Sequence, residues 1–435
     1  MKKTKPHLYL PIEILVRELN SKIFLSLKAS LKGYRVYIGT KKGIDRILDE
    51  KIKTRRSGIY FYKSQILKNR KYIQKIKKTC ESFIVLDEEL GTGVYDIKES
   101  LKERAVFAED TEKFFLIGKK MLSNIKKYSP KFYNISKVTG WLKYELYKKK
   151  NIKIFKKEAT EIKKQYGNFF LFSSNFGTLS DDGLNYKIKA GKVKKSNTKN
   201  IMYFKRSIKD FQFIKNEFNS KSKKINIVIR PHPADAFHSD WYKNINQSRS
   251  LKIAFDNDIV PWIIASKGLI HRGCSTSVDA VLLNKPTFYL KSKRKFPTNE
   301  STLPSRISHK INSLNDILYI KKKKAGPNII KNILSKEIYN IENNNSAYKI
   351  LEEIEKLKIT KELPVKINYY KNMKTYFKFY ISTFIKLFFK NNVLDFKSAG
   401  KFNKKIICDK ISLLSKNNKL LIREVSIDVF EIEKK

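Results

Sequence analysis

Short apolar runs of strand length alternate with longer segments of helical periodicity along the whole chain. Between the first two apolar runs, Leu19, Ile23, Leu27 and Leu31 recur at helical spacing, and Gly33 follows as a helix C-cap. This β-α-β order predicts a parallel sheet with helices on its faces. The predicted strands of the first third are residues 7–10, 34–39, 59–62, 83–86, 113–118 and 137–140.

The pattern repeats after a Lys-rich connector with helical character at residues 144–164. Amphipathic helices are predicted around residues 204–218 and 259–264, and helices alone from residue 313 onward. The predicted strands of this second part are residues 169–174, 225–229, 252–255, a short run beginning at residue 268, and 287–290.

The predicted fold class is therefore α/β, with two Rossmann-like domains facing each other across a cleft and a C-terminal helical extension. Residues 1–148 form the predicted N-terminal, acceptor-side domain and residues 165–312 the nucleotide-sugar domain. Residues 313–435 are expected to form peripheral helices and a basic, aromatic tail.

The first motif with chemical potential ends the strand predicted at residues 225–229. Two prolines in Arg230-Pro231-His232-Pro233 stop that strand. In open α/β sheets, ligands bind beyond the carboxyl ends of strands, where the His232 imidazole and the Arg230 guanidinium can meet an anion. A His-Pro pair after a strand is equally consistent with a plain turn.

The second motif follows the short strand that begins at residue 268. Arg272 and a glycine turn precede Ser275, Thr276 and Ser277, which stand where the next helix begins. Free backbone N–H groups, hydroxyls and the positive end of a helix suit a phosphate group. The same three residues also serve as an ordinary N-cap. A third polar loop, after the strand at residues 169–174, contains Asn175 and Gly177.

Carboxylates follow two predicted strands of the first domain. Glu13 lies in the loop after the first strand, and Asp87, Glu88 and Glu89 directly follow the strand at residues 83–86. One of these acids would act as general base on an acceptor hydroxyl. The alternatives are a solvated first helical turn at Glu13 and a polar loop at residues 87–89.

The composition is strongly basic, with 93 Lys and Arg against 41 Asp and Glu and a formal net charge of +52. The lysines are spread over every segment, and no DNA- or RNA-binding motif is present, so nucleic acid is not an expected partner. An anionic membrane, an acidic glycan and a biased genome composition all remain consistent with this charge.

Three widely spaced cysteines argue against a disulfide framework and for a reducing cytoplasm. No signal peptide and no apolar run of transmembrane length is apparent. Between Ile367 and Phe389, aromatic residues alternate with lysines, a pattern typical of helices at a membrane interface. We expect a cytoplasmic protein, and this segment would hold it at the inner face of the membrane. The alternative is that the segment packs back on the first domain.

At these motifs the sequence resembles bacterial surface-carbohydrate biosynthesis proteins. These are GT-B-like glycosyltransferases of capsule and lipopolysaccharide loci, related to Kdo and sialic-acid-type transferases. The run at residues 230–233, followed by Trp241, matches the family's Arg-Pro-His-Pro motif. The run at residues 270–286 matches a second motif, in which Cys-Thr-Thr precedes an apolar helix and Gly-Lys-Pro, with Asn284 here in place of the Gly. The resemblance covers about residues 7–300, including the acidic loops of the first domain.

The resemblance implies a CMP-activated nonulosonic acid or Kdo as donor and a glycan or lipid-linked acceptor. His232 would bind the donor phosphate and protonate it as it leaves, and Ser275, Thr276 and Ser277 would hold the same group. No cofactor beyond the nucleotide-sugar donor and no metal is expected. One departure is Gly140-Trp141-Leu142-Lys143, where the family usually has Gly-Asn-Pro-Arg in a loop that would influence acceptor choice.

Three other functions fit the same residues. A glycerophosphate or polyol-phosphate transferase would use the same phosphate pocket, and a sugar-nucleotide epimerase would act without an acceptor. A non-catalytic scaffold that binds membranes or polyanions would need only the charge and the aromatic segment.

Overall fold

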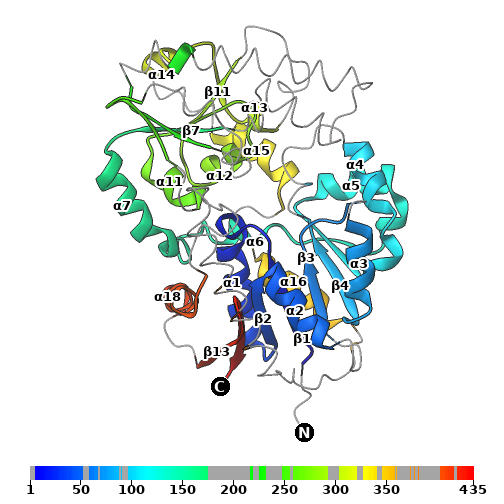
Figure 1. Ribbon diagram of the computed structural model, residues 1–435. Helices are drawn as coiled ribbons and strands as arrows, with labels where there is room; N and C mark the ends of the chain where they lie inside the picture. Colours follow the sequence, from blue (N-terminus) through cyan, green and yellow to red (C-terminus); the bar gives the residue numbers. More distant parts are fainter. Residues whose placement is uncertain are drawn as a thin grey trace. The chain divides into compact units, whose positions relative to one another are not determined.

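The computed structural model describes a defined set of residues in two compact units. The first unit comprises Met1–Ile154 with Asn332–Lys435, and the second comprises Phe155–Lys331 (Figure 1). The described residues are 5–51, 58–66, 69–87, 90, 97–174, 216–218, 225–231, 247–254, 258–291, 303–320, 327–339, 345–357, 359, 373, 377, 381, 402–415 and 419–435.

The first unit is built on an eight-stranded sheet in the order β13-β14-β2-β1-β3-β4-β5-β6. Strands β1 to β6 are parallel to their neighbours in this series. They are β1 (His7–Ile12), β2 (Arg35–Thr40), β3 (Ile59–Tyr62), β4 (Ser82–Leu86), β5 (Lys113–Leu116) and β6 (Ser136–Val138). All six strands predicted for this part of the chain are confirmed, because a parallel sheet covered on both faces needs near-continuous apolar strands.

Helices follow the strands of the first unit as the β-α-β rule requires. Tyr9 and Tyr37 stack at 5.3 Å on adjacent strands, and every residue of β1 is buried. Helices α2 and α4 were not predicted from the pattern, since their charged residues mask the apolar stripe. The helices are α1 (Leu15–Leu31), α2 (Lys41–Lys51), α3 (Arg70–Lys77), α4 (Ile97–Ala105), α5 (Lys119–Tyr128) and α6 (Leu142–Glu145).

The C-terminal part of the chain contributes to the first sheet, which corrects the expectation of helices and a tail for residues 313–435. Strand β14 (Val429–Lys434) pairs antiparallel with β2, and β13 (Leu420–Ser426) pairs antiparallel with β14. Figure 1 shows this hairpin, in red, beside β2. Its charged residues hid the strand pattern. The expected helices are also present, as α15 (Pro327–Glu337), α16 (Ser346–Glu355) and α18 (Lys404–Leu414).

Two glycines allow the C-terminal segments to approach the first sheet closely. A Cβ atom at Gly39 in β2 would lie 2.5 Å from the Asp428 carbonyl oxygen in the hairpin turn. A Cβ atom at Gly118, which precedes α5, would lie 2.0 Å from the Glu337 carbonyl oxygen at the end of α15. The amide of Tyr339 then donates to the Ile117 carbonyl at 2.8 Å. The return of the chain to the first unit therefore requires glycine at both positions, because a larger side chain would collide with the returning backbone.

The second unit has a six-stranded sheet in the order β12-β11-β10-β7-β8-β9, with parallel pairing throughout. Its strands are β7 (Phe170–Ser173), β8 (Ile227–Arg230), β9 (Leu251–Ile253), β10 (Leu269–His271), β11 (Thr287–Leu290) and β12 (His309–Ile311). The pattern predicted five of these strands, whereas the short β12 was missed. The helices named below are α7 (Lys156–Tyr166), α11 (Ile259–Ala265) and α12 (Thr276–Leu282).

Alternate residues of these strands enter two separate cores, one on each face of the sheet. Phe172, Ile227 and Ile270 belong to one cluster, and Leu171 and Val228 belong to the other. Burial on both faces explains why the strands are apolar runs rather than alternating ones.

Within the described residues, no helix is long and apolar enough to cross a membrane. Of the aromatic segment at residues 367–389, the structure describes Met373, Phe377 and Ile381, which are helical and exposed.

We predict that Gly118→Ala destabilises the first unit by about 1–3 kcal/mol, because overpacking against a backbone carbonyl forces the chain apart. Urea unfolding should show a lower midpoint. Lys119→Ala, at the exposed neighbouring position, is the control and should leave the free energy of unfolding within about 0.5 kcal/mol of the wild type. Equal effects of the two substitutions would contradict the close approach.

Candidate functional site

The topology of the second unit creates a ligand-binding position at the carboxyl ends of β7 and β10. From β7 the chain runs to β8 and β9 on one side, and then returns to place β10 on the other side of β7. In open α/β sheets, ligands bind at such a switch point. Ser173, Arg230 and His271 are in register on the three adjacent strands β7, β8 and β10, so both sequence motifs follow strands that flank β7.

A cluster of hydroxyl and thiol groups occupies this switch point. The Ser173 Oγ atom lies 3.4 Å from Cys274 Sγ and 3.4 Å from Thr276 Oγ1. Cys274 Sγ and Thr276 Oγ1 are 3.1 Å apart. Cys274 and Thr276 are partly exposed and Ser275 is exposed. The arrangement presents several small polar groups to a ligand from two different chain segments.

The third hydroxyl of the motif has a different position. Ser277 is fully buried, and its Oγ donates to the Cys274 carbonyl oxygen at 2.9 Å. Ser277 therefore stabilises the turn from inside, whereas Thr276 faces Ser173 and Ser275 is exposed. The contact of Ser275 and Thr276 with a ligand stays a prediction, and the internal hydrogen bond of Ser277 gives this residue a structural role.

His271 supports the turn as a neutral imidazole. The Gly273 amide donates to His271 Nδ1 at 3.0 Å, so the proton is on Nε2, which lies 2.8 Å from Ser308 Oγ. Ser308 Oγ in turn donates to the Pro304 carbonyl at 2.7 Å. Complete burial, together with the neighbouring Arg272, lowers the pKa of His271 to about 3. Gly273 has a φ of 86°, a conformation that favours glycine in this turn.

The return from α12 to β11 contains a residue with positive φ. Asn284 has a φ of 57°, in the left-handed region. Glycine adopts this conformation without strain, and asparagine tolerates it best among the other residues. Asn284 is therefore compatible with the backbone of this turn.

Both arginines of the motifs are buried and bind groups of their own unit. The Arg230 guanidinium donates to the Ala254 carbonyl at 3.3 Å and lies 5.3 Å from the Trp262 ring centroid. The Arg272 guanidinium donates to the Leu290 carbonyl and lies 5.8 Å from the Tyr289 ring. These contacts hold the strand ends together and give both arginines a structural role.

Several of the expected site residues lie outside the residues that the structure describes. They are His232, Pro233, Asn175, Gly177, Glu88 and Glu89. Their assignments remain predictions from the sequence.

In the first unit, a charged cluster lies at the corresponding switch point, between β1 and β3. Glu18, near the start of α1, is buried and accepts hydrogen bonds from the amides of Ile14 at 2.9 Å and Glu13 at 3.2 Å. Lys22 Nζ is 2.8 Å from the Glu18 carboxylate and also donates to the Pro11 carbonyl. These bonds fix the loop after β1.

Burial alone would raise the pKa of Glu18, but the positive charges of Lys22 and Lys63 and the hydrogen bonds lower it below its usual value. Lys63, just after β3, lies 3.6 Å from Glu18 and 2.8 Å from Glu13. Glu13 is thus the described acid of this edge that reaches solvent.

Asp87 occupies a structural position. Its carboxylate accepts from Arg104 Nε at 2.7 Å and from the Leu90 amide at 2.9 Å, and both side chains of the ion pair are buried. Arg104 also donates to Ser64 Oγ at 3.2 Å. Because both carboxylate oxygens of Asp87 are engaged, these contacts favour Glu13 as the described candidate for a general base.

Comparisons with known proteins agree with the two-unit α/β architecture. No family model matches the sequence, and a search of curated proteins finds no relative. Among solved structures, the chain is similar to a His-to-Asn variant of the wall teichoic acid polymerase TagF. That match has a TM-score of 0.50 and 10% identity, and covers 81% of this chain and 89% of that one. The fold is of the GT-B type.

Two further structures match less well. A UDP-N-acetylglucosamine 2-epimerase gives a TM-score of 0.47 at 11% identity and covers 84% of this chain and 100% of that one. The S. aureus MnaA–UDP structure gives 0.46 at 10% identity and covers 81% and 96%.

The loop at residues 140–143 is part of the core of the first unit. Gly140 has a φ of 76°, and Trp141 and Leu142 are buried at the start of α6. Glu145 of α6 accepts from the Ala347 amide at 3.0 Å, which joins α6 to α16. The apolar residues at this position thus have a packing role.

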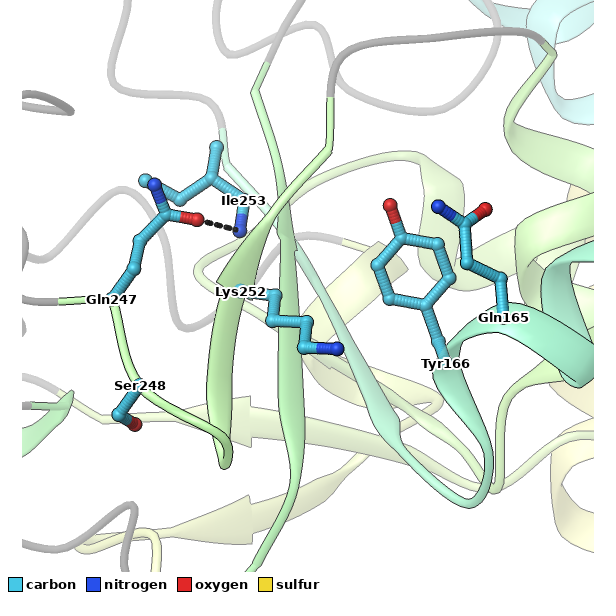
Figure 2. Close-up of a pocket in the computed structure, with 6 residues that line it drawn as sticks. All are labelled: Gln165, Tyr166, Gln247, Ser248, Lys252 and Ile253. Atoms are coloured by element: carbon cyan, nitrogen blue, oxygen red, sulfur yellow. Dashed lines mark hydrogen bonds between the residues drawn. The ribbon is translucent and has the colours of Figure 1, made fainter.

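A pocket of about 480 Å³ lies elsewhere in the second unit, beside the edge strand β9. Figure 2 shows its lining, in which the Lys252 side chain extends towards Tyr166, 5.5 Å from the ring centroid. The lining residues are Gln165, Tyr166, Gln247, Ser248, Lys252 and Ile253. Gln247 and Ser248 precede β9 and Tyr166 ends α7, so this pocket lies away from the carboxyl ends of the strands.

Three site residues were not found by sequence reasoning: Ser173, Lys22 and Lys63. Ser173 lies next to the last residue of the strand predicted at 169–174, and Lys63 directly follows a predicted strand, so the strand-end rule could have found both. Lys22 is one of many lysines and has the i, i+4 spacing to Glu18 that is common on exposed helix faces. Only its burial distinguishes it.

We predict that Arg104→Met destabilises the first unit by about 3–5 kcal/mol, because it leaves the buried Asp87 carboxylate without its ion-pair partner. The double variant Arg104→Met with Asp87→Leu should recover part of this loss. Urea unfolding of both variants measures the difference. A double variant that is less stable than Arg104→Met would contradict a structural ion pair.

The low pKa of His271 predicts a pH-dependent stability. The unfolded state takes up a proton below about pH 6.5 and the folded state only near pH 3, so stability is complete above pH 6.5 and falls as the pH decreases between these values. The slope contributed by this group is about 1.4 kcal/mol per pH unit. His271→Gln, which retains an acceptor and a donor, should remove this part of the slope in urea titrations at pH 7.0, 6.0 and 5.0. An unchanged slope would show that His271 is protonated in the fold.

Proposed function

We propose that this protein is a glycosyltransferase of bacterial surface-polysaccharide biosynthesis, which transfers a sugar from a nucleotide donor to a glycan or lipid-linked acceptor. One observation carries the proposal. At the switch point of the second unit, the Ser173 hydroxyl meets the Cys274-Ser275-Thr276 turn, between strands that lead into the two sequence motifs.

The proposed donor is a CMP-activated nonulosonic acid or Kdo, as the family resemblance suggests. Its phosphate binds the hydroxyls of Ser173, Ser275 and Thr276. His232, two residues beyond the end of β8, donates to the same phosphate and protonates it as it leaves. Arg230 and Arg272 add positive potential from below, since both are buried at the strand ends.

The first unit binds the acceptor, with Glu13 as general base. A base must reach the proton that it removes, and the Glu13 side chain is 44% exposed at a strand end, whereas the Asp87 side chain is 1% exposed and paired. The donor phosphate is neutralised by hydroxyl and imidazole donors, so this mechanism assigns no role to a metal ion. Lysines and the aromatic residues at 367–389 hold the enzyme on the anionic cytoplasmic face of the membrane.

The proposal is tested by calorimetric titration of the full-length protein with CMP and UMP. CMP should bind, His232→Ala should abolish binding, and Thr276→Val should weaken it about 10–100-fold, because a hydrogen bond to a charged group is lost. Thr160→Val is the matched control, since the Thr160 hydroxyl is exposed and donates to Lys156 within α7.

The outcomes separate the candidate functions. Binding of neither nucleotide by the folded protein would overturn the transferase and favour the scaffold. CMP binding with turnover of CDP-glycerol, but of no CMP-sugar, would favour the polyol-phosphate transferase instead. Isomerisation of a nucleotide sugar without an acceptor would favour the epimerase.

A further inference from the structure

We propose that Lys63 is the anion-binding residue of the acceptor site. Its ammonium group binds a carboxylate or phosphate of the acceptor. This anion displaces Glu13 from its ion pair with Lys63. This inference rests on the proposed function and adds a substrate class to it, namely an acceptor that carries negative charge beside the reacting hydroxyl.

The position of Lys63 follows from the topology of the first sheet. From β1 the chain proceeds to β2 on one side and then returns to place β3 on the other side of β1. The loops after β1 and β3 therefore enclose the switch point, where open α/β sheets bind ligands. Glu13 belongs to the first loop, and Lys63 follows the last residue of β3.

The buried carboxylate of Glu18 is satisfied largely without Lys63. It receives two backbone amide hydrogen bonds and a charge-assisted bond from Lys22 at 2.8 Å, whereas Lys63 is more distant at 3.6 Å. Lys22 also binds the Pro11 carbonyl, so its ammonium has two buried acceptors. Glu18 and Lys22 thus form a fixed base for the loop, and the closer partner of Lys63 is Glu13.

The ion pair between Lys63 and Glu13 can be replaced easily by an ion pair with a bound anion. The two groups lie 2.8 Å apart, and the Glu13 side chain is 44% exposed, while the Lys63 side chain is 16% exposed. Exposed ion pairs contribute little to stability, because water solvates the separated charges well. The Asp87–Arg104 pair is the opposite case, because the two side chains are only 1% and 6% exposed and their separation would leave a buried charge.

The surroundings of Lys63 are mostly apolar. Lys63 and Lys22 line a narrow pocket whose other walls are apolar. An apolar wall strengthens the attraction between an ammonium and an anion, because less water screens it. The apolar residues are Leu10, Leu25, Phe61, Tyr62, Leu86 and Leu142.

The exchange has a chemical consequence for Glu13. Once the acceptor anion occupies Lys63, the Glu13 carboxylate can accept the proton of the acceptor hydroxyl. The O–H bond breaks as the hydroxyl oxygen forms a bond to the anomeric carbon, and the bond from that carbon to the donor phosphate breaks with its electron pair passing to the phosphate. An anionic acceptor would thus make the base available only when it is bound.

The test uses three methyl glycosides and the full-length protein. Methyl glucuronide and methyl glucoside 6-phosphate carry the two anionic groups, and methyl glucoside is the neutral counterpart. We expect calorimetric binding of at least one anionic probe and about tenfold weaker or no binding of the neutral one. The relative affinity of the two anionic probes distinguishes a carboxylate acceptor from a phosphorylated one.

Two substitutions should act in opposite directions. Lys63→Met should weaken the anionic probe about tenfold or more, and Glu13→Gln should tighten it about threefold or more, because the internal competitor loses its charge. Lys63→Arg should retain binding and thereby show that the fold tolerates substitution at this position. Lys102→Met is the matched control, since the Lys102–Glu99 pair lies on an exposed face of α4 and should have no effect.

The inference is overturned by unchanged binding in Lys63→Met, by weaker binding in Glu13→Gln, or by equal binding of the neutral probe. It is also overturned if no anionic probe binds to protein that still binds CMP, and the proposed function then stands without it. Failure of CMP binding in the wild type would instead overturn the proposed function.

Discussion

A buried carboxylate near the start of α1 determines the conformation of the loop after β1 in the first unit. Burial of the Glu18 carboxylate costs free energy unless other groups replace the water that solvates it. Two backbone amides of the preceding loop and Lys22 replace this water. The same bonds that solvate the carboxylate therefore hold the loop after β1 in one conformation. The loop carries Glu13, so the position of this exposed carboxylate depends on the neutralisation of the buried Glu18 carboxylate.

The second unit solves a related problem without charge. His271 is fully buried at the corresponding strand end, but its imidazole remains neutral and connects the Gly273 amide to Ser308. A neutral group requires no counter-ion, so the turn above it can present uncharged hydroxyls to a ligand. One unit thus has an ammonium and a carboxylate at its switch point, whereas the other has small dipoles above the buried positive charges of Arg230 and Arg272.

Much of this architecture was predictable because parallel sheets covered on both faces require apolar strands. The strand at residues 59–62 and the strand at residues 287–290 agree with β3 and β11 residue for residue. The hairpin of β13 and β14 was not predicted, since its pairing with β2 joins residues almost 400 positions apart and depends on Gly39. The positions of candidate site residues were predictable where a strand end marked them, as at Glu13 and Thr276, whose roles stay predictions. The distinction between Glu13 and Asp87 was not, because it depends on which carboxylate Arg104 reaches.

The late position of the hairpin has a consequence for biosynthesis. All residues of the second unit are synthesised by the time Lys331 is added, whereas the first sheet gains its partner for β2 only when the strand ending at Lys434 is complete. The inserted unit can therefore fold during translation, while the unit that begins the chain must wait with an open sheet edge. Until then, β2 exposes unpaired backbone groups that could recruit a chaperone or a neighbouring nascent chain.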